Sequence, residues 1–314
     1  MSVTKAFVFG AGMGTRLRPI TDMTPKPLIP IVQKPLITFA LDHLIAAGVN
    51  SFAINTHRLP QQFEERFGEG RYRNCDVALV HEPDLLETGG GMKNAEPLLK
   101  NGPFLTYSGD ILCDVDLPML IDEHFRANND VTLALRQTGL ASAIALRDGR
   151  IVDITEKYGI PGTYDFANIA VWTAGVFDRI APHKKISFIP PLIEWIGQGG
   201  RIGGVVLDQG EWFNVGSAGD YLRAHSTVLQ GHWRPHFVSD PGWPQPVHDT
   251  ADVAPGAKML GCTVVGPNCR VGDDVVLEDT IVWPGAEITS RSRLSRCIVR
   301  SRQTADGTHQ DHVF

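Results

Sequence analysis

Three alternate glycines stand directly after a candidate strand, in the stretch GAGMGTRLRP that begins at Gly10. Glycines allow backbone N–H groups to approach and cradle phosphate oxygens. The stretch is not a dinucleotide fingerprint, because Thr15 replaces the last glycine, and it lacks the Gly-Lys-Ser/Thr end of a P-loop. A tight turn without a ligand would explain the glycines but not the arginine, Arg16, that follows them. We therefore interpret the stretch as a phosphate-binding loop.

A lysine held between two prolines follows this loop, in the stretch TPKPLIP that contains Lys26. Proline fixes its own φ and restricts the residue before it, so Lys26 is expected in an extended, preorganised segment. A surface lysine in a proline-rich loop is the plainer alternative. The combination of this segment with the glycine loop favours a functional role for Lys26.

A carboxylate, Asp110, follows the apolar run Phe104–Ser108 in the tripeptide Ser-Gly-Asp. Side chains at the carboxyl ends of parallel strands point into the crevice where α/β sheets bind ligands. The alternative is a helix N-cap ahead of a segment that begins at Leu117, although Asp116 could fill that position as well. Asp110 is therefore a candidate for a carboxylate that faces a ligand.

Short apolar runs alternate with helical patterns along the first two thirds of the chain. The helical pattern Pro35–Ala47 has one apolar face and is followed by Gly48, a residue type common just past a helix end. This alternation predicts βαβ units, a largely parallel sheet and a doubly wound α/β fold. The candidate strands are Ala6–Phe9, Ser51–Asn55, Val77–His81, Phe104–Ser108 and Val131–Leu135, and further helical and strand patterns cover Ala218–Leu229 and Ile151–Ile154.

The pattern changes after residue 231, so residues 1–231 are assigned to one main domain. Residues 232–248 are rich in proline and are expected to form a linker. Over residues 249–300 apolar residues recur about every six positions, which predicts a parallel β-helix of two or three coils, with an irregular β meander as the alternative. Residues 301–314 are expected to form a polar tail. The apolar positions are Val253, Leu260, Val265, Val271, Leu277, Ile281, Ile288, Leu294 and Ile298.

Composition narrows the class of protein further. The 314 residues are 43% hydrophobic and 20% charged, with a formal net charge of −6, which argues against disorder and against a nucleic-acid binder. No apolar stretch approaches the ~18 residues of a membrane span, and the N-terminus lacks a signal-peptide pattern. The five cysteines are scattered and form no CxxC pair, so neither disulfides nor a zinc site is expected. We expect a reduced cytoplasmic protein.

The combination GxGxGTRLRP…PKPLxP resembles the sugar-1-phosphate nucleotidylyltransferases, also called nucleotide-sugar pyrophosphorylases. The resemblance covers the chain from residue 4 to residue 229. Within the family, the run HEPDLLETGGG at residues 81–91 is most similar to the N-acetylmuramate-1-phosphate uridylyltransferases, whereas a hexapeptide tail is found in mannose-1-phosphate guanylyltransferases. The resemblance implies a Rossmann-like mixed sheet, here followed by a short left-handed parallel β-helix.

The resemblance also implies an enzyme that joins a nucleoside triphosphate, marginally UTP, to a sugar-1-phosphate and releases pyrophosphate. The attacking phosphate is largely a dianion at pH 7, so positioning and charge stabilisation matter more than a general base. The implied catalytic residues are Arg16 for the triphosphate, Lys26 for the α-phosphate, Asp110 for Mg²⁺ and Lys157 for the sugar phosphate. Nucleotide binding is implied for Gly10, Ala11, Gly12, Gly14, Thr15, Glu87, Gly89 and Gly90, and sugar-phosphate binding for Glu156, Lys157 and Asn168.

One position departs from the family pattern. The family usually has a second metal-binding aspartate where this chain has Asn214, whose carbonyl still ligates Mg²⁺ but adds no charge. Asn214 therefore leaves open a non-catalytic regulatory paralogue that binds nucleotide sugars. The hexapeptide tail leaves open two further alternatives, a mannose-1-phosphate guanylyltransferase-like enzyme and an acyltransferase that works through the β-helix. Residues 253–299 contain no histidine for acyl transfer, so we interpret the β-helix as structural, with homo-oligomer contact as a further role.

Overall fold

The computed structural model describes residues 2–314, which form two compact units. The sheet unit runs from the start of the described chain to Met13 and continues over Ala40–Trp212. The C-terminal unit joins Gly14–Phe39 to Phe213–Phe314. These units do not follow the boundaries drawn from the sequence, because a segment close to the N-terminus folds with the C-terminal third of the chain.

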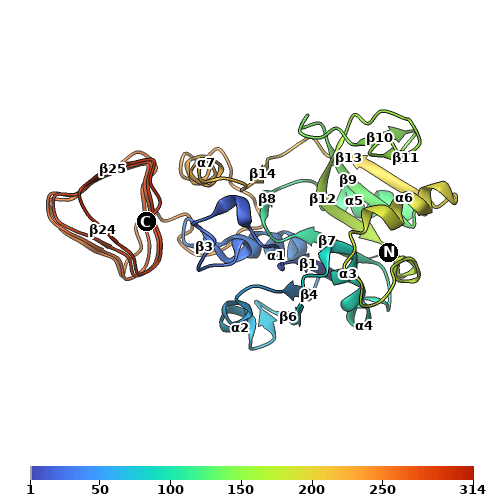
Figure 1. Ribbon diagram of the computed structural model, residues 1–314, viewed down its shortest axis with the longest axis horizontal. Coiled ribbons are helices and arrows are strands. Elements are labelled where there is room, and N and C mark those ends of the chain that lie inside the picture. The colour runs from blue at the N-terminus through green and yellow to red at the C-terminus, as the bar shows by residue number, and fades with distance from the viewer. Residues whose placement is uncertain (1) are drawn as a thin grey trace. The chain divides into compact units, whose positions relative to one another are not determined.

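A ten-stranded mixed sheet is the centre of the sheet unit. Strands β1, β4, β6 and β7 run parallel side by side, while β12 pairs antiparallel with both β7 and β9 (Figure 1). The predicted strands are confirmed within one or two residues. In spatial order the strands are β10 (Ile144–Arg147), β11 (Arg150–Ile154), β13 (Ile202–Val206), β9 (Val131–Arg136), β12 (Asp165–Trp172), β7 (Phe104–Ser108), β1 (Lys5–Phe9), β4 (Ser51–Thr56), β6 (Cys75–His81) and β5 (Arg71–Tyr72).

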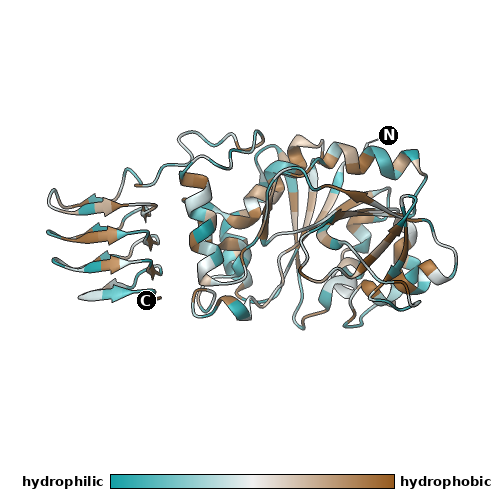
Figure 2. Cartoon of the chain, turned by 90° about the horizontal axis from the view of Figure 1, so that it is seen from above, coloured by the Kyte–Doolittle hydropathy of each residue, from teal (hydrophilic) through white to brown (hydrophobic). Residues whose placement is uncertain are grey.

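Helices and short connections complete the sheet unit, and the strands supply most of its apolar core. The sheet strands are coloured mainly as hydrophobic in Figure 2, and Phe7, Leu133 and Trp172 of the core cluster are fully buried. The helices include the predicted one after the glycine loop, which Gly48 follows with a positive φ of 95°. They are α1 (Leu36–Ala46), whose first four residues belong to the C-terminal unit, α2 (Pro60–Phe67), α3 (Glu87–Asn94), α4 (Glu96–Leu99), α5 (Leu117–Arg126) and α6 (Ile189–Gly197), with the 3-10 helix η3 (Ala174–Arg179) and the short strand β8 (Ile111–Cys113).

The C-terminal unit begins with the segment Gly14–Phe39, which has little regular structure of its own. It contains two 3-10 turns, η1 (Thr15–Leu17) and η2 (Lys26–Leu28), and the two-residue strands β2 (Pro30–Ile31) and β3 (Lys34–Pro35). Strand β14 (Trp212–Asn214) leads into α7 (Ala218–Leu229), which coincides with the predicted helix and is capped by the Ser217 side chain. The proline-rich stretch 232–248 then crosses the unit without a helix or a strand.

The predicted parallel β-helix is present, and its stacked coils are visible in Figure 2. Two of its sheets have four strands and the third has three, so the β-helix is longer than the two or three coils expected. Leu260, expected to point inward, is exposed, and Met259 pairs in register with the buried Leu277 instead. The sheets are β15 (Asp252–Val253), β18 (Arg270–Val271), β21 (Glu287–Ile288) and β24 (Thr304–Ala305); β16 (Lys258–Leu260), β19 (Val276–Glu278), β22 (Arg293–Ser295) and β25 (Thr308–Gln310); and β17 (Val264–Val265), β20 (Ile281–Val282) and β23 (Ile298–Val299).

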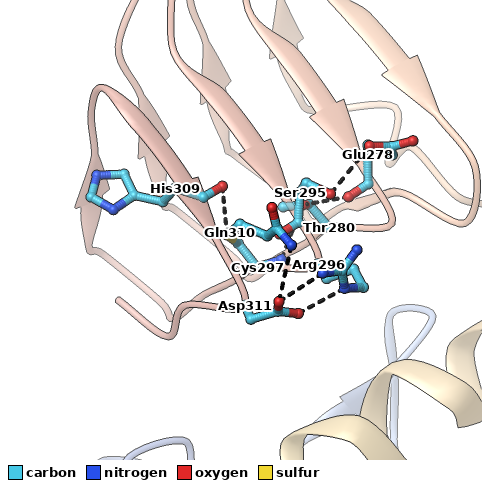
Figure 3. A network of polar contacts seen from close by, with 8 residues as sticks. All are labelled: Glu278, Thr280, Ser295, Arg296, Cys297, His309, Gln310 and Asp311. Carbon is cyan, nitrogen blue, oxygen red and sulfur yellow. Dashed lines mark hydrogen bonds and ion pairs between the residues drawn. The ribbon is translucent and has the colours of Figure 1, made fainter.

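Residues 301–314, which the sequence separates as a polar tail, form a further coil of the β-helix. Strands β24 and β25 pair parallel with β21 and β22. Arg296 holds this coil through a two-pronged ion pair with Asp311, in which both N···O distances are 2.7 Å, and Gln310 also donates to Asp311 (Figure 3). Polar composition therefore does not separate this stretch from the β-helix, because its backbone still completes the parallel ladders.

Acidification is expected to destabilise the C-terminal unit through His225 of α7. The ring is fully buried, its Nδ1 lies 2.9 Å from the carbonyl oxygen of Tyr221, and its Nε2 meets no partner within residues 2–314. Burial lowers the pKa of His225 from 6.5 to about 4, against an opposing effect of the Tyr221 carbonyl. Between these two values the unfolded chain binds a proton that the folded chain does not. The free energy of unfolding should therefore fall by about 3 kcal/mol as the pH drops through this window.

Urea denaturation at near-neutral pH and again near the lower pKa measures this loss. His225→Gln removes the titrating group and is expected to make the dependence on pH shallower. Some dependence should persist in the variant, because burial also lowers the pKa of His124 in the sheet unit to about 4. A variant with the full wild-type dependence on pH would contradict the assignment to His225.

Candidate active site

The glycine loop begins where β1 ends, and its first residue is fixed by a side chain from the neighbouring strand. The Gly10 N–H donates to Oδ1 of Asn55 at 2.8 Å. A Cβ at Gly10 would lie 2.6 Å from the Asn55 carbonyl oxygen, so close backbone approach requires glycine here. Gly12 is exposed and open, whereas Gly14 adopts the left-handed conformation, with a φ of 61°, just before η1. The loop passes from the sheet unit into the C-terminal unit after Met13.

A buried glutamate, Glu82, holds this loop together with the start of α3. Glu82 is fully buried, and its Oε1 accepts from Nδ2 of Asn55 at 2.8 Å. Its Oε2 accepts from the N–H of Leu86 at 2.9 Å, immediately before α3. The chain Leu86–Glu82–Asn55–Gly10 therefore couples two stretches that the sequence assigned to nucleotide binding. The sequence analysis did not identify Asn55 or Glu82 as part of the site. The one feature of the sequence that could have indicated them is that each is a polar residue near the end of a strand.

The glycines of α3 are packed against backbone. Gly89 and Gly90 are buried, and both N–H groups donate to the carbonyl oxygen of Ile186, at 2.8 and 2.9 Å. Glu87 starts the helix with a positive φ of 61° and is exposed. The structure thus gives these glycines a packing role, and their expected contact with a nucleotide stays a prediction.

Replacing Gly90 by alanine is expected to destabilise the sheet unit by about 2 kcal/mol. Its Cβ would lie 2.3 Å from the Lys184 carbonyl oxygen, and a backbone atom cannot easily move away. Gly219→Ala in α7 is the matched control, since the nearest heavy atom to its Cβ is 3.8 Å away. Thermal unfolding should show a clear loss for Gly90→Ala and no loss for Gly219→Ala. Equal melting temperatures for the two variants would contradict this packing role.

Asp110 lies just past the carboxyl end of β7, as predicted. The Ser108 hydroxyl donates to its Oδ1 at 2.7 Å and so orients the carboxylate. The N-cap of α5 is Asp116, whose Oδ1 accepts from the N–H of Met119 at 2.8 Å. The alternative of a capping role for Asp110 is therefore wrong.

Glu156 and Lys157 lie on an exposed turn directly after β11. Thr155 and Glu156 both have positive φ, 58° and 56°, and a buried carboxylate supports this strained backbone. Asp153 is fully buried, and its Oδ2 accepts from the N–H of Tyr158 at 2.7 Å and of Ile160 at 3.0 Å. Burial alone would raise the pKa of Asp153, but these backbone donors outweigh it and the pKa is lowered. Asp153 is a further residue that the sequence analysis missed.

Asn168 lies in β12, where the pairing with β9 shifts register between Phe166 and Ala170. Its φ of 63° is left-handed, which places it in an irregular part of the strand. Such bulges re-aim side chains and are common beside active sites. The position of Asn168 is compatible with the expected sugar contact, which stays a prediction.

The C-terminal unit brings Lys26 and Asn214 together. Lys26 begins η2, its side chain is only 6% exposed, and its Nζ donates to Oδ1 of Asn214 at 3.3 Å. The expectation of an extended segment is wrong at Lys26, because this residue begins a 3-10 turn. Its ammonium group is nevertheless buried and donates to an amide. Arg16 lies in η1 of the same unit and is exposed, as is Thr15, while Ala11 in the sheet unit is buried.

The described residues contain neither a ready-made cluster of metal ligands nor a membrane-spanning helix. Within residues 2–314, no group of three or more His, Cys, Asp or Glu side chains is arranged to hold a metal ion. None of the helices in the same range combines the length and apolar character that a membrane crossing requires.

A mixed Rossmann-like sheet whose first strand runs into a glycine loop defines an α/β protein of a class that binds ligands at the carboxyl ends of its strands. Residues 5–231 match the model of the family described as Nucleotidyl transferase. The chain belongs to this family.

Known relatives differ in the substrates that their names give. The chain is 31% identical over 298 residues to a mannose-1-phosphate guanylyltransferase from Mycobacterium tuberculosis, covering 93% of this chain and 83% of the relative. It is 44% identical over 113 residues to an N-acetylmuramate alpha-1-phosphate uridylyltransferase from Neisseria meningitidis, covering 36% of this chain and 49% of that one. The solved inositol-1-phosphate CTP transferase from T. maritima shares the fold, with a TM-score of 0.59 and 17% identity, over 74% of this chain and 98% of that chain.

Proposed function

We propose that this protein joins a nucleoside triphosphate to a sugar-1-phosphate, giving a nucleoside-diphosphate sugar and pyrophosphate. The observation that carries the proposal is the glycine loop after β1, held by Asn55 and Glu82 and continued by the segment with Arg16 and Lys26. Membership of the nucleotidyl transferase family supports the same reaction class.

The side chains suit an exchange between phosphates. The sugar phosphate is largely a dianion at pH 7 and attacks the α-phosphorus without a general base, while the bond to pyrophosphate breaks. Lys26 stabilises charge at the α-phosphate, and Arg16 binds the triphosphate and the leaving pyrophosphate. Lys157 binds the sugar phosphate, and Glu156 and Asn168 bind the sugar. Net charge of −6 is no obstacle, because anion binding needs positive charge only locally.

The donor atoms of Asp110 and Asn214 fit Mg²⁺, which prefers hard oxygen ligands and commonly binds one or two carboxylates together with substrate phosphates. When bound, Mg²⁺ would offset negative charge on the phosphates. Asp110 offers a carboxylate that Ser108 already orients. Asn214 offers an amide oxygen that accepts from Lys26 in this structure.

For the base, we propose UTP as the preferred nucleotide and a sugar related to N-acetylmuramate as its partner. The run at residues 81–91 and the 44% identity over 113 residues to the uridylyltransferase support this choice. GTP with mannose-1-phosphate is the competing pair, supported by a similarity that extends over 93% of the chain.

A pyrophosphate-release screen tests the proposal. UTP, GTP, dTTP, CTP and ATP are each combined with a panel of sugar-1-phosphates in the presence of Mg²⁺. Release is expected only when a matching sugar phosphate is present, and fastest with UTP. Release with GTP and mannose-1-phosphate alone would overturn the choice of base but leave the reaction class intact.

A second candidate is a non-catalytic paralogue that binds nucleotide sugars, and the amide at position 214 is the observation that favours it. An aspartate there would add the missing negative charge but also form an ion pair with Lys26, given the 3.3 Å contact. Ligand binding without pyrophosphate release in the wild type, with turnover restored in Asn214→Asp, would establish the regulatory role. Turnover in the wild type excludes it.

A further inference from the structure

The segment Gly14–Phe39 depends on the rest of the C-terminal unit for its shape. It carries Arg16 and Lys26, yet its regular structure consists of two 3-10 turns, two strands of two residues each and the first four residues of α1. Internal hydrogen bonds are local, such as Leu28 N–H to the Pro25 carbonyl at 2.8 Å. A segment of this kind is held by contacts from outside it, because it offers few backbone ladders of its own.

A buried hydrogen-bond chain links the β-helix to this segment. The indole Nε1 of Trp283 lies 2.9 Å from the hydroxyl oxygen of Tyr221, and that hydroxyl also bonds to the carbonyl oxygen of Pro30. An indole N–H only donates, so the Tyr221 hydroxyl accepts from Trp283 and donates to Pro30. Tyr221 is 0% exposed and Trp283 is 2% exposed. Burial holds the pKa of Tyr221 well above its usual range, so the phenol keeps the proton that it donates.

Further contacts fix the segment on both sides of Lys26. On the N-terminal side, the guanidinium of Arg300 in the β-helix donates to the Pro19 carbonyl at 3.1 Å. On the C-terminal side, the Gln33 amide donates to the carbonyl of Val265 in β17 at 2.9 Å. Trp243, in the proline-rich stretch, donates to the Ile31 carbonyl at 3.3 Å. The β-helix therefore holds the segment at Pro19, at Gln33 and, through Tyr221, at Pro30.

We propose that Trp283 and Tyr221 are positioning residues for Lys26, and that the β-helix is thereby a working part of the active site. The inference rests on the proposed role of Lys26. Pro30 closes the stretch TPKPLIP in which Lys26 stands, so a fixed Pro30 carbonyl limits where the lysine can lie. The two aromatic side chains touch no substrate and act only through the backbone of this segment.

Two conservative variants, Tyr221→Phe and Trp283→Phe, test the proposal. Tyr221→Phe removes the hydroxyl group and Trp283→Phe removes the indole N–H, and each variant keeps an aromatic ring. With saturating substrates, kcat is expected to fall by about ten- to a hundredfold, because small misplacements of catalytic groups have effects of that size. KM should change by less than about twofold, since ground-state binding is not the affected step. Tyr72→Phe is the matched control, because its hydroxyl bonds to Asp42 in the sheet unit and no change in kcat is expected.

A coupling measurement separates positioning from a general loss of structure. In a Lys26→Met background, Tyr221→Phe is expected to cause no further loss in single-turnover rate, because its effect passes through the lysine. An equal loss in both backgrounds, or unchanged kcat in both Phe variants, would overturn the proposal. If Tyr221→Phe does not fold, Trp283→Phe alone carries the test.

Hydrogen–deuterium exchange supplies a readout that does not depend on activity. The peptide over residues 26–36 is expected to exchange about tenfold faster in both Phe variants and unchanged in Tyr72→Phe. Unchanged exchange in all variants would show that the hydrogen bonds from Trp283 through Tyr221 to Pro30 do not hold the segment. A wild type that releases no pyrophosphate from any substrate pair would instead refute the proposed function, while the exchange data still decide whether Trp283 and Tyr221 fix the segment.

Discussion

Replacing Lys26 by methionine is expected to lower kcat by about two to three orders of magnitude. Methionine keeps the apolar stem in its buried position but removes the positive charge that the α-phosphate needs as pyrophosphate departs. The lysine is only 6% exposed, so solvent cannot easily supply a substitute charge. Single-turnover pyrophosphate release at saturating substrate measures the chemical step directly.

The control for this variant is Lys100→Met, an exposed lysine that follows α4 in the sheet unit. It makes the same change of charge at an exposed position that has no assigned role in catalysis or binding, and wild-type kcat is expected. Circular dichroism and thermal unfolding establish that both variants fold. A folded Lys26→Met protein with wild-type kcat would remove this lysine from the proposed chemistry.

Replacing Asp110 by asparagine is expected to lower kcat by about a hundredfold or more and to raise the Mg²⁺ concentration needed for half-maximal rate by about tenfold. The amide oxygen can still accept from Ser108, so the local backbone should keep its shape while the negative charge is lost. Titrating Mg²⁺ at fixed substrate concentrations separates the effect on metal binding from the effect on maximal rate.

Asp148→Asn is the matched control, because Asp148 lies on the exposed turn between β10 and β11. Its φ of 50° is left-handed, a conformation that asparagine tolerates as well as aspartate. The control should keep the wild-type response to Mg²⁺. If Asp110→Asn kept it too, the assignment of Asp110 to the metal would be wrong.

The part of the fold that could be predicted from sequence is the part whose apolar runs are continuous. The strands β1, β4, β7 and β9 are buried along most of their length and therefore appear as mainly apolar stretches. Strand β6 is partly exposed, but its central residues Val77–Val80 are still a continuous apolar run. Strand β12 was not predicted. It begins with the buried polar residue Asp165 and changes register near Asn168, so its residues follow no simple period.

The β-helix shows where a spacing rule stops being sufficient. Register partners in successive coils are 18 residues apart between β16 and β19, 17 apart between β19 and β22 and 15 apart between β22 and β25. A coil of 17 or 15 residues has at least one side shorter than six residues. The core cluster then contains Val282 and Val299, whereas the sequence pattern picked the adjacent and equally buried Ile281 and Ile298. Two neighbouring apolar residues do not reveal which one faces the interior.

The last coil escaped prediction for a related reason. Ala305 pairs in register with Ile288, and His309 with Leu294, so small or polar residues stand where earlier coils have large apolar ones. Terminal repeats of such arrays are commonly atypical in this way. The spacing of apolar residues therefore predicts the inner coils of the β-helix but not its last coil.

The sequence was sufficient to predict the glycines and the charged residues of the candidate site. It was not sufficient to predict the residues that hold them in place. Asn55 bonds to Gly10 across a separation of 45 positions, and Glu82 bonds to Asn55 across 27, which no local pattern reveals. Asp153 supports the turn of Glu156 and Lys157 from inside a strand. Such residues have no motif of their own, because their role depends on which distant backbone groups the fold brings to them.

The interleaving of the chain between its two units affects how proteins of this kind can recombine. The stretch 213–314 and the stretch 14–39 form one compact body, although most of the sheet unit separates them in sequence. In a chimera that received only the C-terminal third of a relative, the segment Gly14–Phe39 would keep its own sequence. Its contacts at Pro19, Pro30 and Gln33 would then be made with residues of the relative. A chimera is expected to fold and to be active when both stretches are taken from the same relative. The two stretches should therefore change together when proteins of this kind recombine.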